Sequence, residues 1–345
     1  MVEIEVQKAC QGDCIWLRCV AEKSVNIVID AGPSTFAAGF KNLIDKIAGN
    51  KERIDLLIFS HIDDDHIRGC IRYLQDEGKK IIDKVWINGS GTSVYSNMQE
   101  HSPNNVSGLV SLIEEKGISI EYPIFEGKEY NFCEGVIKVI APTEKEVLNV
   151  AEKIEKRNKI QEHASDSFLG NIDEAVDEYK SDTSETNRAS IIICVEFENK
   201  KLLFSGDSTS ENILRAINKY YACDEFEIVK LPHHGSPRNI SRELIKQIKS
   251  ERFIISTNKR VDKVTLRRFL EERENTEFLL NYDWWSNGYF TNDDRKKYID
   301  TNKIVMLLDL RTLEIKSDVR RLFVHDNRMF AERAFYCIQK KFLRI

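Results

Sequence analysis

The sequence lacks a hydrophobic run long enough to cross a membrane. Its most apolar runs, IDLLIF and IIICVEF, have the length of buried strands, whereas a transmembrane helix needs about 18 or more apolar residues. The first ten residues, MVEIEVQKAC, also lack the basic segment and apolar core of a signal peptide. We therefore expect a cytoplasmic protein that has no membrane as a partner.

An excess of positive charge is absent too. The 51 Lys and Arg residues face 56 Asp and Glu residues, which gives a formal charge of −5. This balance excludes a basic field over the whole molecule, so any contact with nucleic acid has to come from a local patch.

The eight cysteines do not have the spacing of a zinc or redox motif. Three lie in apolar or helical patterns, and three others lie close together without CxxC spacing; these are Cys70, Cys194 and Cys337, and Cys10, Cys14 and Cys19. Cytoplasmic thiols stay reduced, so we expect packing residues and no disulfides.

Linker-forming residues are scarce, with six prolines and 16 glycines among 345 residues and no Pro/Gly-rich stretch. At about 150 residues per domain the length allows two domains or one large α/β domain. The missing linker favours a single domain over residues 1–345. Within it, residues 144–186 are charge-rich and form either a solvated helical excursion, a mobile loop or a disordered stretch. Residues 252–345 form a C-terminal extension with the same alternating pattern as the rest.

The apolar pattern alternates between strands and helices, which predicts a mixed α/β fold with a covered sheet. Residues 36–49 have helical spacing and end at Gly49, a helix stop. The apolar segments with strand character are VEIEVQKA, CIWLRCVA, VNIVIDAG, RIDLLIFS, KVWING, RASIIICVEF, LLFSGD, FEIVKLP, FIISTN, FLLNYDWW and KIVMLLDL.

Histidines and acids gather where three predicted strands end. They are His61, Asp63, Asp65 and His66 after RIDLLIFS, Asp207 at the end of LLFSGD, and His233 and His234 after EIVKLP. Strand carboxyl ends are where α/β sheets bind ligands, and imidazoles with carboxylates suit a divalent cation. An acidic helix N-cap is the alternative, but it accounts for one aspartate and for neither histidine around it.

Six short motifs stand in an order that resembles the metallo-β-lactamase fold. They are GDC (Gly12, Asp13), IDAG (Asp30, Gly32), SHIDDDHIRG (60–69), NRAS (187–190), LLFSGD and KLPHHGS. Within that fold they are most similar to the soluble hydrolase domain of ComEC-type competence proteins. The resemblance covers residues 11–236 and implies a four-layer αββα sandwich and a metallohydrolase.

The resemblance also implies a role for each matching residue. His61 and Asp63 would bind a first metal, Asp65, His66 and His233 would bind a second, and Asp207 would bridge them. His234 would be a candidate proton donor, and Asn187 and Ser190 would support the bridging region. A hydroxide bound by one such cation, or between two, is a strong nucleophile near neutral pH. Asp65 would hold this hydroxide in line for attack.

Two features depart from the wider family. The pattern is HxDxDH, with Asp63 where a histidine is usual, and no equivalent is found for a further histidine on the first metal. His163 lies in the charged excursion and either reaches in or faces solvent. The first site is therefore oxygen-rich, which favours Mn²⁺ or Mg²⁺ there over Zn²⁺.

Two other segments have a functional and a structural interpretation. A basic cluster follows FIISTN and either contacts a phosphodiester backbone or is a solvated face; it contains Lys259, Arg260, Lys263, Arg267 and Arg268. Tyr282, Trp284 and Trp285 either stack on a base or belong to the core. We expect His101 and His325 to be surface residues.

These patterns favour a metal-dependent hydrolase of phosphodiester bonds, acting on a nucleic acid or nucleotide with Zn²⁺ or Mn²⁺. The same fold also hosts other hydrolases, so fold does not fix the reaction. One alternative is the hydrolase component of a multi-protein regulatory or defence system, which has protein partners and acts on a protein or small signal molecule. The other is a metal-bearing interaction module without turnover, which the full ligand set opposes.

Overall fold

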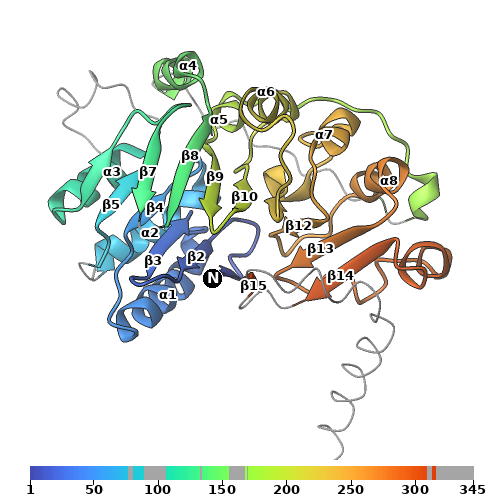
Figure 1. Ribbon diagram of the computed structural model, residues 1–345, viewed down its shortest axis with the longest axis horizontal. Helices are drawn as coiled ribbons and strands as arrows, with labels where there is room; N and C mark the ends of the chain where they lie inside the picture. Colours follow the sequence, from blue (N-terminus) through green and yellow to red (C-terminus); the bar gives the residue numbers. More distant parts are fainter. Residues whose placement is uncertain are drawn as a thin grey trace, which may run out of the picture.

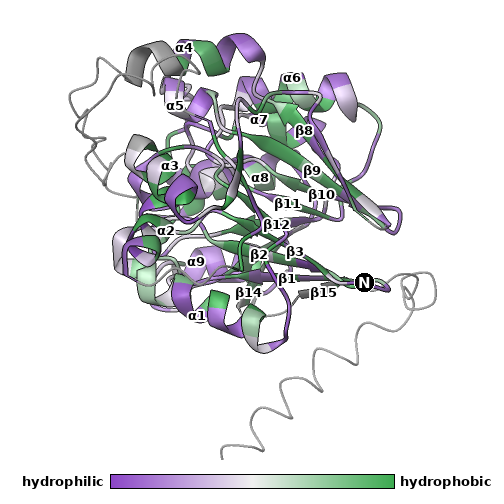
Figure 2. Ribbon diagram, turned by 90° about the vertical axis from the view of Figure 1, so that its left-hand side faces the viewer, coloured by the Kyte–Doolittle hydropathy of each residue, from purple (hydrophilic) through white to green (hydrophobic). Residues whose placement is uncertain are grey.

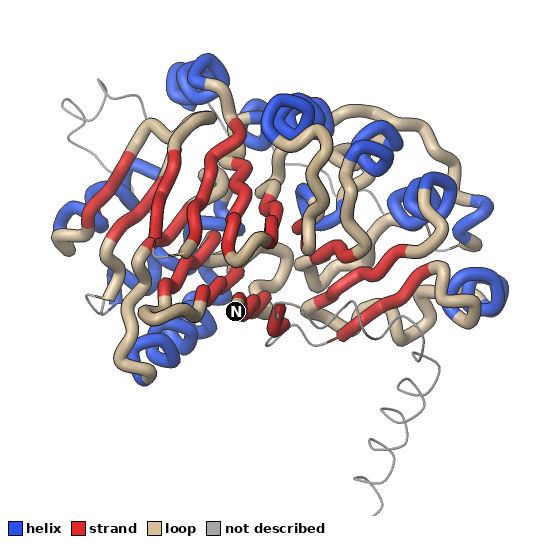
Figure 3. Tube along the Cα trace, viewed as in Figure 1, coloured by secondary structure: helices blue, strands red, loops and turns tan. Residues whose placement is uncertain are grey.

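Two β-sheets lie face to face in the centre of the molecule, and helices cover their outer faces (Figures 1 and 3). The computed structural model describes residues 1–76, 81–88, 106–132, 134–154, 168, 170–308 and 313–315. Figure 2 shows the layers from the side, with α1 below one sheet and α6 above the other. The predicted four-layer αββα sandwich is confirmed. Among the described residues, no helix is both long and apolar enough to span a membrane.

The first sheet has seven strands in the order β15-β1-β2-β3-β4-β5-β6. They are β1 (Val2–Val6), β2 (Ile15–Cys19), β3 (Val25–Ile29), β4 (Leu56–Ile58), β5 (Lys84–Trp86), β6 (Ser119–Glu121) and β15 (Leu313–Ile315). Strands β3 to β6 are parallel, whereas β15, β1, β2 and β3 pair antiparallel. The helices on its outer side are α1 (Ala37–Gly49), which follows the short helix η1 (Ser34–Phe36), α2 (Asp64–Asp76) and α3 (Val106–Glu115).

The second sheet has eight strands in the order β14-β13-β12-β11-β10-β9-β8-β7. They are β7 (Glu129–Phe132), β8 (Gly135–Ala141), β9 (Ile192–Phe197), β10 (Lys200–Phe204), β11 (Ile228–Lys230), β12 (Arg252–Ile255), β13 (Thr276–Leu280) and β14 (Ile304–Leu308). Strands β10 to β14 are parallel. The helices with this half are α4 (Glu144–Ile154), α5 (Glu185–Arg188), α6 (Ser210–Tyr220), α7 (Arg242–Gln247), α8 (Lys263–Glu272) and α9 (Asn292–Asp294), with the short helices η3 (Ile172–Glu174), η4 (Pro232–Gly235) and η5 (Arg295–Ile299).

The apolar residues of the predicted strands and helices are buried in three clusters. The central core lies between the sheets, where Leu17 and Ile27 of the first sheet belong to one cluster with Ile193 and Leu202 of the second. Each helix layer has its own apolar cluster against a sheet. Such burial stabilises the fold by about 25 cal/mol per Å² of apolar surface. Helix α1 ends at Gly49, as its spacing predicts.

The C-terminal segment is part of the second sheet as far as residue 308. It supplies β12, β13 and β14, and residues 313–315 return to pair with β1. In the charge-rich excursion, residues 144–154 form α4 and residues 170–184 run along the helices of the second half, while 155–167 and 169 lie outside the described residues.

Four of the cysteines expected to pack are buried: Cys14, Cys19, Cys70 and Cys194. Burial raises the pKa of the Cys19 and Cys194 thiols to about 12, so both stay protonated near neutral pH. Cys10 is half-buried and also free, and Cys337 lies outside the described residues.

Candidate metal centre

The candidate site lies at the carboxyl ends of the parallel strands of both sheets. Asp30 follows β3, His61 follows β4, Asp207 follows β10 and His234 follows β11. His66 lies in the first turn of α2, which begins directly after the β4 loop. Parallel strands end at a common edge, so side chains far apart in the sequence meet there.

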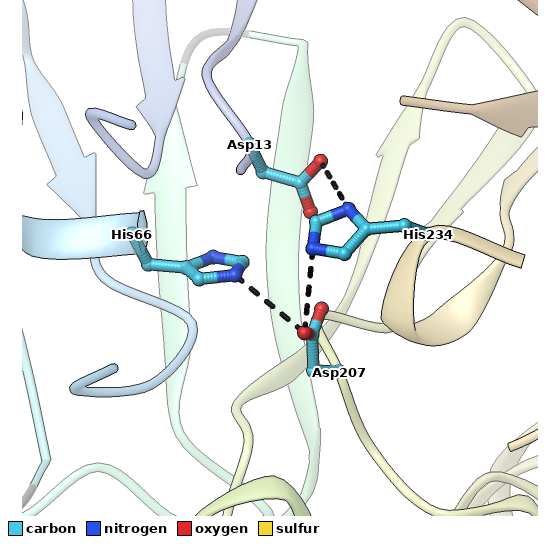
Figure 4. A group of neighbouring side chains, drawn as sticks. All are labelled: Asp13, His66, Asp207 and His234. Atoms are coloured by element: carbon cyan, nitrogen blue, oxygen red, sulfur yellow. Dashed lines mark ion pairs between the residues drawn. The ribbon is translucent and has the colours of Figure 1, made fainter. Parts of the chain in front are cut away.

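Asp207 is the centre of this group and is 3% exposed. Its Oδ2 lies 3.6 Å from His66 Nε2, 3.6 Å from His234 Nε2 and 3.8 Å from His61 Nε2. Figure 4 shows the His66 and His234 rings turned toward this carboxylate. These distances are too long for hydrogen bonds. They approach the roughly 3.3 Å between two atoms that bind one ion tetrahedrally at about 2.0–2.1 Å.

Two more carboxylates complete the group from the α2 side. Asp65 Oδ1 lies 3.8 Å from His66 Nε2, and its Oδ2 lies 3.9 Å from His234 Nε2. Asp63 Oδ2 lies 3.8 Å from His61 Nε2. Among the residues that the structure describes, one group has ligand atoms that all lie within 4.8 Å of one another, and it consists of Asp13, His66, Asp207 and His234. The other donors extend this group, so we distinguish a compact second set and a looser first set around Asp207. The first set adds His61 and Asp63, and the second adds Asp65, His66 and His234.

Hydrogen bonds on the far side of each ring fix which nitrogen faces the centre. His66 Nδ1 donates to Asp30 Oδ2 over 2.9 Å, and His234 Nδ1 donates to the Ser256 carbonyl over 2.8 Å. Carboxylates and carbonyls only accept, so Nδ1 carries the proton in both rings. His61 Nδ1 lies 3.1 Å from Ser60 Oγ, which gives its own proton to Asp30. In each ring Nε2 is therefore the nitrogen that faces Asp207 and that can bind a cation, as in protein metal sites.

Three of the central atoms are buried without a hydrogen-bond partner. They are His66 Nε2, His234 Nε2 and Asp207 Oδ1. Leaving such an atom unsatisfied costs about 1–3 kcal/mol, so these neighbouring atoms have the character of ligand atoms. Lone pairs from imidazole and carboxylate suit a divalent cation, and the residues fit such an ion.

The fully buried Lys230 balances part of the negative charge. Its ammonium group contacts Asp13 Oδ2, lies 3.6 Å from Asp207 Oδ1 and donates to the Gly206 carbonyl over 3.0 Å. Burial alone would raise the pKa of the Asp207 carboxyl, but His234, His66, His233 and Lys230 hold it well below its usual range. Asp207 is therefore ionised and available to a cation.

Asp13 lies on the far side of His234 from Asp207 (Figure 4). Its Oδ1 is 3.6 Å from His234 Nδ1, and its other oxygen contacts Lys230. Asp13 is close enough to join the group, and its Oδ1 is buried without a hydrogen-bond partner while its Oδ2 contacts the Lys230 ammonium. The sequence marks Asp13 only through the GDC motif. No motif identifies Lys230 as a site residue, because in the sequence it is simply the last residue of an apolar strand.

The two adjacent histidines lie differently from what their implied roles lead us to expect. His233 is predicted to bind metal and His234 to donate a proton, yet it is His234 whose ring faces Asp207. Both residues have left-handed backbone angles, with φ of 46° and 55°, and this turn directs the second ring inward. His233 Nδ1 instead lies 3.2 Å from Asn187 Nδ2 and 3.4 Å from Asp182 Oδ2.

Buried polar residues join His233 to the backbone around Asp207. Asp182 accepts from Asn187 over 2.7 Å and from Asn239 over 2.9 Å, and Asn239 also donates to the Asp207 carbonyl over 3.2 Å. A Cβ atom on Gly206 would lie 3.2 Å from Ser190 Cβ. Asn187 and Ser190 therefore lie beside His233 and Gly206, whereas Asp182 and Asn239 stand in no motif that the sequence reveals.

Most of the predicted basic cluster is used to hold the fold together. Lys263 is buried and pairs with Asp294 over 2.8 Å, and Arg268 is buried and paired with Asp177. Arg267 donates to two backbone carbonyls of the 170–182 segment. These three residues do not extend toward a nucleic acid. Lys259 and Arg260 are exposed.

Of the three aromatic residues Tyr282, Trp284 and Trp285, the two tryptophans belong to the core or pack against it. Trp284 belongs to the core of the second half, with its ring centroid 5.0 Å from that of Tyr289, and Trp285 packs against this core. Tyr282 is half-buried and accepts a hydrogen bond from the Cys10 backbone over 2.8 Å. His101, His163 and His325 lie outside the described residues.

Comparison with known proteins agrees with the fold. Residues 8–83 match the family model of the metallo-beta-lactamase superfamily. No curated protein matches the chain. The match includes Asp13, Asp30 and the SHIDDDHIRG motif, so the α2 side of the metal centre lies within it.

Several solved structures are similar to the chain at low identity. The metallo-beta-lactamase fold protein YhfI from Bacillus subtilis is 8% identical, with 91% of this chain and 100% of that chain covered and a TM-score of 0.41. A diphosphatase from the PhnP family is 8% identical, with 92% and 98% covered and a TM-score of 0.41. Unliganded yeast PDE1 is 8% identical, with 91% and 99% covered and a TM-score of 0.43. The expectation of a metallo-β-lactamase-fold enzyme with a divalent metal is supported by the family match together with the candidate metal centre.

Proposed function

We propose that the chain is a metal-dependent hydrolase of phosphodiester bonds in a nucleic acid or nucleotide. The observation that carries the proposal is the group of carboxylates and imidazoles around Asp207, with Nε2 of His61, His66 and His234 within 3.8 Å of its Oδ2. Two cations held close together suit an in-line displacement at phosphorus, because both the attacking and the leaving oxygen carry negative charge. The similarity of SHIDDDHIRG, LLFSGD and KLPHHGS to ComEC-type hydrolase domains favours the same reaction.

The bound cations would act as Lewis acids and would lower the pKa of a coordinated water. Asp207 would hold both cations, and Asp30 and the Ser256 carbonyl accept the Nδ1 protons of His66 and His234, which leaves Nε2 of each ring as the nitrogen that would bind a cation. Asp65 is 30% exposed at its side chain. Because it also lies 3.8 Å from His66 Nε2, it would accept a hydrogen bond from the attacking water and orient it toward phosphorus.

The two sets differ in the metal that they prefer. The first has one imidazole and two carboxylates, which favours Mn²⁺, whereas the second has two imidazoles and suits Zn²⁺ as well. We infer that activity is retained with Mn²⁺ in both sets and is highest with Mn²⁺ or with a mixture of the two metals.

A substrate screen tests the reaction. The protein is stripped of metal, reloaded with Mn²⁺ or Zn²⁺ and assayed with bis(p-nitrophenyl) phosphate, p-nitrophenyl acetate and a chromogenic β-lactam. We expect phosphodiester hydrolysis that disappears with a chelator and in Asp207→Asn. Hydrolysis of the ester or lactam without any phosphodiester would contradict the proposal while leaving the metal centre intact.

A further inference from the structure

We propose that Lys8, Lys259 and Arg260 form a phosphate rim that binds a second phosphate of the substrate, next to the scissile bond. This inference rests on the proposed phosphodiester hydrolysis and narrows it to substrates with more than one phosphate, of which an oligonucleotide is the simplest. The three residues come from different parts of the chain, and all three are exposed. Their positions follow from the loops that hold them.

Hydrogen bonds join these loops at the edge of the molecule where the strands end. The Cys10 N–H donates to Tyr282 Oη over 2.8 Å, and the Asn258 N–H donates to the Cys10 carbonyl over 2.9 Å. The ammonium group of Lys8 lies 5.7 Å from the centre of the Tyr282 ring. The loop after β1, the loop after β12 and the loop after β13 therefore meet at Cys10 and Tyr282.

Asn281, which is 3% exposed, joins the three loops through buried hydrogen bonds. Its Oδ1 accepts from the Thr257 N–H over 3.1 Å, and its Nδ2 donates to the Gln7 carbonyl over 2.7 Å. The same amide lies 3.2 Å from Ser256 Oγ. A rim built on such a buried amide is held in place before substrate arrives, so less entropy is lost on binding.

The rim adjoins the metal centre through two of its loops. Ser256, whose carbonyl accepts from His234 Nδ1 over 2.8 Å, precedes Lys259 by three residues, a distance of at most about 11 Å along the chain. Gly12, in the loop of Lys8, lies so close to α2 that a Cβ there would be 1.9 Å from the Asp65 carbonyl. Figure 4 shows Asp13 of this loop reaching His234.

The charges of the rim face solvent. Within the described parts of the chain, neither Lys8 nor Lys259 has a carboxylate partner. Arg260 donates to the Asn287 carbonyl over 2.9 Å, which orients its guanidinium group. Lys263 and Arg268 of the same sequence cluster are buried in ion pairs. Lys259 and Arg260 are thus the part of that cluster that is placed to bind an anion, and Lys8 joins them from the loop after β1.

Three matched substrates isolate the contribution of the second phosphate. TpT, pTpT and TpTp have the same scissile bond, and the last two carry an additional phosphate on one side or the other. The Mn²⁺-loaded full chain should cleave at least one phosphorylated form with a kcat/KM about tenfold above that of TpT. The variant K8Q/K259Q/R260Q should reduce this ratio to about one without lowering its metal content or its rate on bis(p-nitrophenyl) phosphate.

The control variant is K23Q/K246Q/K249Q, which removes the same charge from exposed lysines at the opposite ends of the strands. It should keep the preference for the phosphorylated substrate. Equal rates on all three substrates, or a preference that survives in the rim variant, would overturn the rim and leave phosphodiester hydrolysis standing. No cleavage of any phosphodiester by the wild-type chain would instead overturn the proposed function, and the rim with it.

Discussion

Asp207 faces imidazoles that come from both halves of the molecule. His61 and His66 belong to the first half, and His234 follows a strand of the second sheet. A carboxylate in that place serves both donor sets, whereas the Asp63 carboxylate lies 3.8 Å from His61 Nε2 and its side chain is 41% exposed. The two aspartates should therefore differ in how much they contribute.

Asp207→Asn should remove activity more completely than Asp63→Asn, by about 100-fold or more in kcat. The amide cannot bridge two cations, and removing one partner of a buried charged group costs about 3–5 kcal/mol. Rates on bis(p-nitrophenyl) phosphate and metal content by elemental analysis measure both effects. An equal loss of kcat and of bound metal in Asp63→Asn would show that the first set binds its ion as tightly as the second.

His234→Gln should lose bound metal, whereas His233→Gln should retain it. The reason is geometric, because His234 Nε2 lies 3.6 Å from Asp207 Oδ2 while His233 contacts Asn187 and Asp182. Metal affinity measured by titration should fall about 10–100-fold or more for His234→Gln. Metal loss in the His233 variant alone would restore the assignment that the sequence predicts.

The residues of the centre differ in how well the sequence reveals them. His61, Asp65, His66 and Asp207 follow strands in recognisable motifs, so their convergence is predictable. The order of His233 and His234 is not, because it depends on two residues with positive φ that no pattern announces. Lys230 is hidden for another reason, since a lysine at the end of an apolar strand normally reaches solvent.

At the scale of elements, α2 is held against the first sheet by a contact between backbones. The Ala31 N–H donates to the His66 carbonyl, and the Gly69 N–H donates to the Gly32 carbonyl, each over 2.8 Å. A Cβ on Gly69 would lie 1.9 Å from the Ala31 carbonyl oxygen. Glycine is required there because the backbone of the neighbouring turn cannot move without displacing Asp30, which orients His66.

Gly69→Ala should therefore destabilise the protein by about 2–4 kcal/mol and weaken metal binding together with it. Gly49→Ala is the matched control, since a Cβ at the end of α1 would meet nothing within 4 Å. It should be neutral or stabilising by up to about 1 kcal/mol. Urea unfolding of both variants measures the difference. A Gly69 variant as stable as the wild type would contradict the tight contact between α2 and the turn.

Most elements are predictable from periodicity because their apolar residues face one side. The helix over residues 36–49 and the hairpin of β9 and β10 are examples. The division into two facing sheets is different, since it depends on which strands pair over long sequence distances. Strand β15 shows this clearly, because residues 313–315 add to the sheet that begins at residue 2. Local patterns carry no information on such pairing.

At the scale of the whole molecule, the two sheets must keep a fixed relative position, because the metal centre contains residues from both. Glu121 contributes to that relation at the edge of the sandwich. It lies on β6 of the first sheet and pairs with Lys128, which directly precedes β7 of the second, over 3.1 Å. It also accepts from Trp86 Nε1 over 2.7 Å and from Lys84 over 2.9 Å.

Glu121→Gln should lower the free energy of unfolding at neutral pH by about 1–2 kcal/mol, because bonds to a charged group are lost. Burial alone would raise the pKa of Glu121, but the bonds from Lys84, Lys128 and Trp86 lower it to about 2, from 4.5. Its contribution is thus fully present above about pH 4.5 and is lost as the pH falls toward 2. Urea midpoints from pH 7 to pH 2 should show the wild type losing this increment and converging on the variant. Glu129→Gln, a substitution of an exposed residue on β7, serves as the control. If the urea midpoints of the Glu121 variant and the wild type depend on pH in the same way, the ion pair between Glu121 and Lys128 does not join the sheets.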